Sequence, residues 1–275
     1  MPNPINSAVQ KDLDKHSKKN QKTYFDNIED GEFEINRPHG TGRLYSFLLD
    51  YKFSRAVKSI PCSLDGKKVL NVCCGSGMDA EFLAKAGATV TVLDISEGAV
   101  RRANERARRF GFQIVSVVGD VENIPFADKS FDVVFVHDGL HHLSTPYTGI
   151  REMARVSNGI VVLIEPAKAM ATKLAVKIGF ALEHEESGNF VYRFSKTELR
   201  ELFESLSMTI SCFVRYFMYY HHKPTKVYRL FDNPVLFRLA EALFYSINAV
   251  VGGLGNKMCC VATKNGVYNQ TQQNR

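Results

Sequence analysis

The sequence contains no tryptophan, no Cys-x-x-C pair and no uninterrupted apolar run long enough to cross a membrane. Stacking of bases on tryptophan is therefore excluded, and zinc fingers and ribbons lack their usual ligand spacing. The six cysteines lie mostly inside apolar runs, as Cys73-Cys74 and Cys259-Cys260 do, which favours buried thiols in a reducing compartment. The N-terminal stretch has no apolar region of the signal-peptide kind, so we expect a cytoplasmic protein.

Composition is that of an ordinary folded protein. Of the 275 residues, 45% are hydrophobic and 23% are charged, which suits one enlarged domain with a sizeable core. The formal net charge of +6 permits nucleic acid or an anionic membrane as a partner without indicating either. Arginines recur between positions 101 and 109, and we interpret them as a solvated helix face rather than an RNA-binding one.

From Lys67 onward, short apolar runs alternate with amphipathic segments, as in a parallel sheet covered by helices on both faces. A helix is predicted from Arg43 to about Lys58, and Ser96 and Ser195 are predicted to cap two more. The predicted strands are Lys68–Cys73, Thr89–Leu93, Gln113–Val118, Phe131–Val136, Ile160–Ile164, Met208–Val214 and Lys257–Thr263.

We divide the chain into an N-terminal helical arm, residues 1–60, a main domain, residues 61–264, and a polar tail, residues 265–275. Within the main domain we expect two additions, a lid at 181–194 and an insertion at 215–252.

The insertion includes an amphipathic helix, predicted from Phe231 to Val251. Arg238 and Glu241 interrupt its apolar sequence, so we predict no transmembrane span. Packing of this helix on the sheet is the simpler interpretation, and peripheral contact with a membrane is the alternative.

The sharpest motif is a strand that enters a glycine-rich turn between Val69 and Ala80. Gly75 and Gly77 let the backbone turn tightly and let a cofactor approach the main chain without meeting a Cβ. Asp94 ends the next strand, where a carboxylate can accept both ribose hydroxyls of an adenosine. The same pattern satisfies the dinucleotide fingerprint, so an NAD(P)-dependent oxidoreductase stays open at this point.

Further segments separate these interpretations. Gly119-Asp120 ends the third strand, where an aspartate can accept from an adenine amino group, and His137 to Leu143 follow the fourth strand. With these motifs, the stretch from about Lys67 to Glu165 resembles the class I S-adenosylmethionine-dependent methyltransferases. It is most similar to the small-molecule branch, methyltransferase type 11, that includes ubiquinone- and menaquinone-biosynthesis enzymes.

The resemblance implies an α/β, Rossmann-like fold: a seven-stranded, mostly parallel sheet with the last strand antiparallel and helices on both faces. It implies S-adenosyl-L-methionine as cofactor and methyl transfer to a small-molecule acceptor by in-line displacement. The chain departs from the family at Asn71, where an acidic residue is usual, and lacks the usual Lys-Pro-Gly-Gly before the fifth strand. The cofactor contacts implied are Tyr24, Cys74, Gly75, Ser76, Gly77, Asp94, Ile95, Asp120, Val121 and His137.

Methyl transfer needs mainly alignment of the acceptor and exclusion of water, and it needs a base only when the acceptor is a hydroxyl or a carbon acid. His141 and His142 are the candidate bases, and Glu165 is a candidate to orient the acceptor or a histidine. Purely structural roles remain open for all three, including helix capping by Glu165.

His141 is four positions after His137, but no third ligand is well placed, so we expect no metal. We expect a small-molecule acceptor, no nucleic acid, and a monomer or homodimer. A non-catalytic cofactor-binding scaffold is the further alternative.

Overall fold

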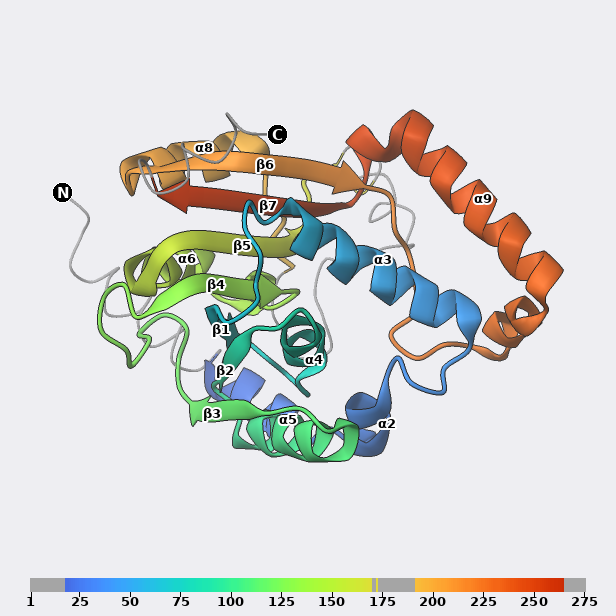
Figure 1. Ribbon diagram of the computed structural model, residues 1–275, viewed down its shortest axis with the longest axis horizontal. Helices are drawn as coiled ribbons and strands as arrows, with labels where there is room; N and C mark the ends of the chain where they lie inside the picture. The colour runs from blue at the N-terminus through green and yellow to red at the C-terminus, as the bar shows by residue number, and fades with distance from the viewer. Residues whose placement is uncertain (1–17, 170–171, 173–190, 265–275) are drawn as a thin grey trace.

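The computed structural model describes residues 18–169, 172 and 191–264. Its centre is a seven-stranded sheet of order β3-β2-β1-β4-β5-β7-β6 (Figure 1). The first five strands are parallel, whereas β7 pairs antiparallel with both β5 and β6. The predicted sheet, with its antiparallel last strand, is thereby confirmed. The strands are β1 Lys68–Val72, β2 Thr89–Asp94, β3 Ile114–Val118, β4 Phe131–His137, β5 Ser157–Pro166, β6 Met208–Tyr216 and β7 Lys257–Lys264.

Helices cover both faces of the sheet, and each face has its own apolar core. Helices α3, α4 and α5 pack on one face, and α6 and α8 pack on the other. The predicted caps at Ser96 and Ser195 are confirmed, because both side chains accept a main-chain N–H in the first helical turn. The α-helices are α2 Gly31–Asn36, α3 Arg43–Ser59, α4 Met78–Lys85, α5 Glu97–Phe110, α6 Pro146–Val156, α8 Lys196–Ser205 and α9 Pro234–Val251. The 3-10 helices are η1 Leu140–His142, η2 Lys226–Asp232 and η3 Gly252–Leu254.

Strand β3 corrects one expectation. Its apolar residues predicted a strand buried on both faces, yet Val115 is 60% exposed and Val118 is 48% exposed. The reason is its place at the edge of the sheet, where β2 alone among the described strands lies beside it.

The N-terminal segment packs on the sheet face that carries the first core. Tyr45, Leu49 and Phe53 of α3 are almost completely buried against it. Before α3 come α2 and a helix at residues 18–26, which we call the cap helix. Residues 1–17 of the predicted arm and the predicted tail lie outside the described residues, and the domain division stays a prediction.

Arg106 contradicts the interpretation of the α5 arginines as a solvated face. Its side chain is fully buried, and its Nε donates to Glu81 Oε2 at 2.8 Å. The remaining guanidinium N–H groups donate to the carbonyl oxygens of Glu34, Ile35 and Arg37. This arginine therefore fastens the N-terminal segment to α5, although Arg101 and Arg108 are exposed as predicted.

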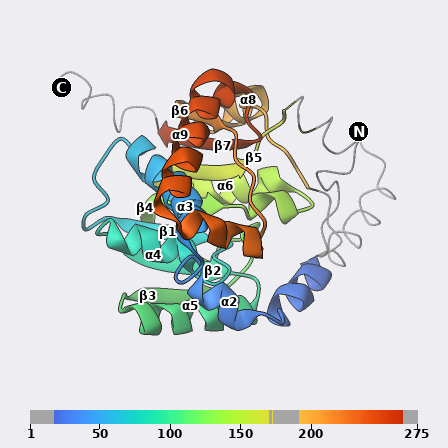
Figure 2. The same ribbon diagram turned by 90° about the vertical axis from the view of Figure 1, so that its right-hand side faces the viewer.

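Helix α9 also differs from the expected packing. It lies at the edge of the molecule, alongside α3 and away from the sheet (Figures 1 and 2). Phe47 and Tyr51 of α3 meet the rings of Phe237 and Phe244 edge to face. The interpretation that α9 packs on the sheet is therefore wrong, because α3 already covers the sheet beneath it.

Glu34 of α2 makes the stability of the N-terminal segment dependent on pH. Burial would raise the pKa of this carboxyl, but Arg37 and His222 outweigh burial and lower the pKa to about 2 from 4.5. A lowered pKa stabilises the fold above the unfolded value, and that contribution disappears as pH falls from about 4.5 towards 2.

We expect Glu34→Gln to lower the free energy of unfolding by roughly 2–3 kcal/mol at pH 7, and by much less near pH 2. Urea unfolding of both proteins across this range measures the difference. A difference that is the same at both ends of the range would contradict this role of Glu34.

Candidate functional site

The glycine-rich turn connects β1 to α4, and its two glycines serve different purposes. Both have positive φ, 51° at Gly75 and 77° at Gly77. A Cβ placed on Gly77 would lie 3.0 Å from the Cβ of Ala103, so this glycine lets α4 and α5 approach closely. A Cβ on Gly75 would meet no atom within 4 Å. The space for a ligand is therefore beside Gly75, whereas Gly77 serves packing.

Asp94 ends β2 facing this turn, and the main chain fixes its carboxylate. Its Oδ2 accepts from the Gly75 N–H and its Oδ1 from the Ser96 N–H, each at 2.9 Å. Burial raises the pKa of Asp94 above its usual range. Each carboxylate oxygen can accept a second hydrogen bond, so Asp94 suits a ligand with two adjacent hydroxyl donors. Ile95, the next residue, is half-buried.

Asp120 follows β3 on the neighbouring strand end. Its Oδ1 accepts from the Glu122 N–H at 2.8 Å, and its Oδ2 pairs with Lys18 Nζ at 2.6 Å. Val121 beside it is buried. The predicted contacts to the methionine part (Gly75), the ribose (Asp94) and the adenine (Asp120) therefore come from adjoining strands at one edge of the sheet.

The cap helix is docked over this edge. Asp26 Oδ1 accepts from Ser96 Oγ at 2.8 Å and from the Gly98 N–H at 2.9 Å. The Phe25 ring meets His142 edge to face, with ring centres 5.5 Å apart. Tyr24 is 39% exposed and lies edge-on to Phe25. The cap helix thus lies where the resemblance to the methyltransferases expects it, while closure of Tyr24 over a cofactor stays a prediction.

Arg102 of α5 joins the cap helix to the glycine turn. It donates to the Phe25 carbonyl at 2.7 Å and to Ser76 Oγ at 3.3 Å. Cys74 of the same turn is buried, and burial raises the pKa of its thiol well above the usual range. The thiol of Cys74 is therefore kept neutral, and contact of Cys74 with a cofactor stays a prediction.

Asn71 near the end of β1 occupies the position where the methyltransferases usually have an acidic residue, and Asp79 lies beside it. Asn71 is fully buried, and its Nδ2 lies 3.4 Å from Asp79 Oδ2. Within the described part of the chain, its Oδ1 has no hydrogen-bond partner. Asp79, in the first turn of α4, also holds His137 Nδ1 at 3.0 Å. An acidic group thus lies next to position 71, on α4, and the sequence argument did not select this residue.

His141 and Glu165 form a buried pair after β4. Glu165 Oε2 lies 2.8 Å from His141 Nδ1, and its Oε1 accepts the N–H groups of Gly139 and Leu140. Glu165 therefore contacts a histidine and the N–H groups at the start of η1, and its role in orienting His141 stays a prediction. His142, by contrast, is half-buried and faces Phe25 of the cap helix.

Of the predicted lid, 181–194, residues 181–190 lie outside the described residues, and residues 191–194 are described. Its last residues reach the candidate base, because the Tyr192 N–H donates to the His141 carbonyl at 3.3 Å. The Tyr192 hydroxyl also lies 2.6 Å from that of Tyr147 on α6.

A buried cluster of charged groups adjoins His137 and was not predicted. Lys52 of α3 is fully buried, contacts His137 Nε2 and lies 2.7 Å from the Tyr220 hydroxyl. Asp138 accepts from Lys257 at 2.5 Å. Burial alone would raise the pKa of Asp138, but Lys257, His137 and Lys52 hold it well below its usual range. Burial likewise opposes ionisation of Tyr220, yet the Lys52 ammonium lowers its pKa.

Asp138, His141 and Glu165 bring possible metal-ligand atoms within 4.8 Å of one another. The donor set does not suit a cation, because Lys257 and Lys52 already neutralise Asp138 and Glu165 already accepts three hydrogen bonds. We therefore assign no metal to this group.

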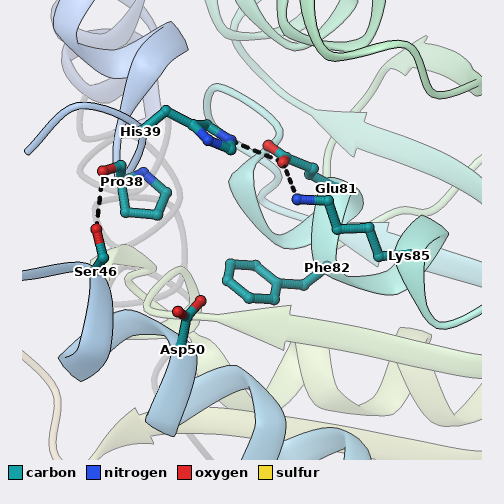
Figure 3. Close-up of a pocket in the computed structure, with 7 residues that line it drawn as sticks. All are labelled: Pro38, His39, Ser46, Asp50, Glu81, Phe82 and Lys85. Atoms are coloured by element: carbon teal, nitrogen blue, oxygen red, sulfur yellow. Dashed lines mark hydrogen bonds and ion pairs between the residues drawn. The ribbon is translucent and has the colours of Figure 1, made fainter. Parts of the chain in front are cut away.

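A separate pocket of about 210 Å³ lies between α3 and α4 (Figure 3). It is polar, with His39 and Lys85 both paired to Glu81. No residue predicted to bind cofactor or acceptor lines it. Its lining is Pro38, His39, Ser46, Asp50, Glu81, Phe82 and Lys85.

Comparison with known proteins agrees with this geometry. Residues 70–163 match the family model described as a methyltransferase domain. The chain is 34% identical over 117 residues to demethylmenaquinone methyltransferase of Corynebacterium efficiens, covering 42% of this chain and 48% of the relative. It is 38% identical over 94 residues to 27-O-demethylrifamycin SV methyltransferase of Amycolatopsis mediterranei, covering 33% of this chain and 35% of the relative. The chain thus spans only about half the length of the first of these relatives.

Among solved structures, magnesium protoporphyrin IX methyltransferase from Synechocystis PCC 6803 with bound SAH shares the fold. The TM-score is 0.59 at 18% identity, over 90% of this chain and 100% of that one. The [4+2]-cyclase SpnF also shares it, with a TM-score of 0.60 at 17% identity, over 90% and 96% of the two chains. These likenesses establish the fold alone.

An NAD(P)-dependent oxidoreductase would have a complete second mononucleotide-binding half, whose last strand is parallel to the fifth. Instead, β5 is followed in the sheet by antiparallel β7, and β6 lies outside it. Residues 70–163 thus match a methyltransferase domain by sequence, and the chain around them shares the fold of a solved methyltransferase.

Proposed function

We propose that this protein transfers a methyl group from S-adenosylmethionine to a small molecule whose acceptor atom is a hydroxyl oxygen or an acidic carbon. The observation that carries the proposal is the placement of Gly75, Asp94 and Asp120 at adjoining strand ends, within a methyltransferase domain. When bound, this cofactor supplies a methyl group already activated by its sulfonium charge.

The site fits such a cofactor. Open space beside Gly75 admits a ligand against the main chain, and Asp94 presents a fixed carboxylate to a ribose diol. Asp120 and Val121 provide a polar and an apolar surface for adenine. The unpaired Asn71 Oδ1 and the nearby Asp79 carboxylate suit the methionyl ammonium.

The cap helix supports a role in closing the site. Lys18 binds Asp120, and Asp26 binds the N-terminal end of α5, so the helix bridges the adenine and ribose ends. We infer that this arm excludes water from the cofactor, with Tyr24 and Phe25 as its aromatic groups.

For an acceptor that loses a proton, we assign the base to His141. Glu165 accepts the Nδ1 proton, so proton uptake falls to Nε2. The carboxylate also stabilises the imidazolium that forms, as the orienting acid does in other histidine pairs. The His142 ring instead faces Phe25 of the cap helix, and we assign His142 to the closed cap helix.

The relatives narrow the acceptor class. Two matched proteins are named as methyltransferases of demethylmenaquinone and of 27-O-demethylrifamycin SV, and the second name gives an oxygen as the methylated atom. We propose a small-molecule acceptor of this kind, in a cytoplasmic enzyme whose six cysteines are free thiols.

We expect His141→Gln to lower kcat for such an acceptor by about 10²–10⁴-fold, the range typical of a lost general base. The affinity for S-adenosylhomocysteine should stay within about threefold of wild type, since His141 belongs to the acceptor side. Transfer of labelled methyl to a demethylated naphthoquinol provides the rate, and His142→Gln is the matched control with a smaller loss. Equal losses in kcat for both variants would remove His141 from the role of base.

A further inference from the structure

We propose that the outer face of α9 and η2 binds the surface of a lipid bilayer that carries anionic headgroups. An exposed helix of a soluble protein normally turns polar side chains to water. Helix α9 does the opposite, since its outward residues are mainly large and apolar. We call these residues, together with two from η2, the apolar face: Val227, Leu230, Val235, Leu236, Leu239, Leu243 and Val250.

The exposure of this face is large along its whole length. Leu239 and Leu243 are each 62% exposed and Val250 is 84% exposed, and none of the residues of α9 is fully buried. The segment from Pro234 to Leu254 has a mean hydropathy of 1.4. Contiguous exposed apolar surface on this scale marks a site of association with another apolar phase.

The packing of α9 favours a position in the plane of the membrane rather than across it. The opposite side of the helix is occupied, because Phe237 and Phe244 contact Phe47 of α3. The Asn248 side chain also forms two hydrogen bonds with the main chain of Phe217, which directly follows β6. A helix held along one side by the protein can insert only its other side, as interfacial helices do.

Charge identifies the kind of surface. Lys226 and Arg229 alternate with Val227 and Leu230 along η2, and both are exposed. In the described chain neither pairs with a carboxylate. Such cations beside an apolar face complement anionic headgroups. Each Lys or Arg near the surface of an anionic membrane adds to the free energy of binding. A second copy of the chain would place these like charges together across an isologous contact, which makes it the less favoured occupant.

Helix α3 connects the apolar face to the acceptor side of the site. Tyr51 of α3 contacts Phe244 of α9, and the next residue, Lys52, contacts His137. Binding of α9 to a bilayer would therefore hold this side of the domain near the membrane surface, whatever the acceptor is.

The test is co-sedimentation with vesicles of phosphatidylcholine alone and of phosphatidylcholine mixed with phosphatidylglycerol. We expect the full chain to bind the mixed vesicles, and Leu239→Glu to bind them at least about tenfold more weakly, since burial of one leucine contributes more than that factor. Val115→Glu is the matched control, because Val115 is equally exposed, on strand β3, and outside the apolar face. It should bind like wild type.

A double change of Lys226 and Arg229 to Gln should weaken binding to the mixed vesicles and remove the preference for them over phosphatidylcholine alone. Sedimentation velocity without vesicles measures self-association of the same proteins. Absence of vesicle binding, equal binding by Leu239→Glu and wild type, or a dimer that Leu239→Glu dissociates in a protein that ignores vesicles would each overturn the proposal.

Discussion

Asp94→Asn should weaken the binding of S-adenosylhomocysteine by about 10- to 150-fold, because a hydrogen bond to a charged group contributes about 1.5–3 kcal/mol. The carboxylate of Asp94 is held between the N–H groups of Gly75 and Ser96, facing the open space beside the glycine turn. An amide of the same shape keeps only one acceptor oxygen. The ribose diol then loses at least one of its two acceptors.

The matched control is Asp132→Asn, since Asp132 accepts the Lys68 N–H at 3.0 Å at the opposite end of the sheet. Asp132 uses one carboxylate oxygen for its main-chain hydrogen bond, which the amide oxygen of asparagine can replace, so Asp132→Asn should lose little stability. Only the change at Asp94 should reduce affinity in calorimetry. If both variants bind S-adenosylhomocysteine like wild type, Asp94 does not contact the ribose of this ligand.

Arg106→Met should lower the free energy of unfolding by about 3–5 kcal/mol, the usual cost of removing one partner from a buried ion pair. The guanidinium is fully buried against Glu81 and three carbonyl oxygens of the N-terminal segment. Methionine fills part of the volume but leaves these acceptors without their donors. We therefore expect the segment around α2 to become sensitive to limited proteolysis as well.

Arg108→Met is the control for this prediction. Arg108 is on the same helix, but its side chain is 75% exposed and pairs with Glu105 one turn away. Exposed pairs of this kind contribute little, so the variant should stay within about 1 kcal/mol of wild type in urea unfolding. Similar values for the two variants would mean that Arg106 does not anchor the N-terminal segment.

The sequence was informative where local patterns decide structure. The β-branched runs, the N-caps at Ser96 and Ser195 and the glycine turn all depend on neighbours close along the chain, and the structure confirms these elements. The order of Gly75, Asp94 and Asp120 also sufficed to place them together, because carboxyl ends of parallel strands share one edge of a sheet.

Residues whose partners are distant in sequence were missed. Lys52 and Asp138 meet across 86 positions, and Arg106 reaches carbonyls about 70 positions earlier. One signal was present, since Lys52 falls on the buried stripe of α3 between Leu49 and Ala56, where a lysine is out of place unless it is paired. The exposure of α9 could not be predicted in this way. An apolar stripe has the same sequence pattern whether protein or lipid covers it.

The central claim is that the glycine turn and the two strand-end aspartates bind S-adenosylmethionine. Calorimetry of the wild-type chain with S-adenosylmethionine, S-adenosylhomocysteine and NADH tests it most directly. The account predicts saturable binding of the first two ligands and none of NADH. Binding of NADH alone would contradict it, and would mean that the turn at Gly75 serves a dinucleotide.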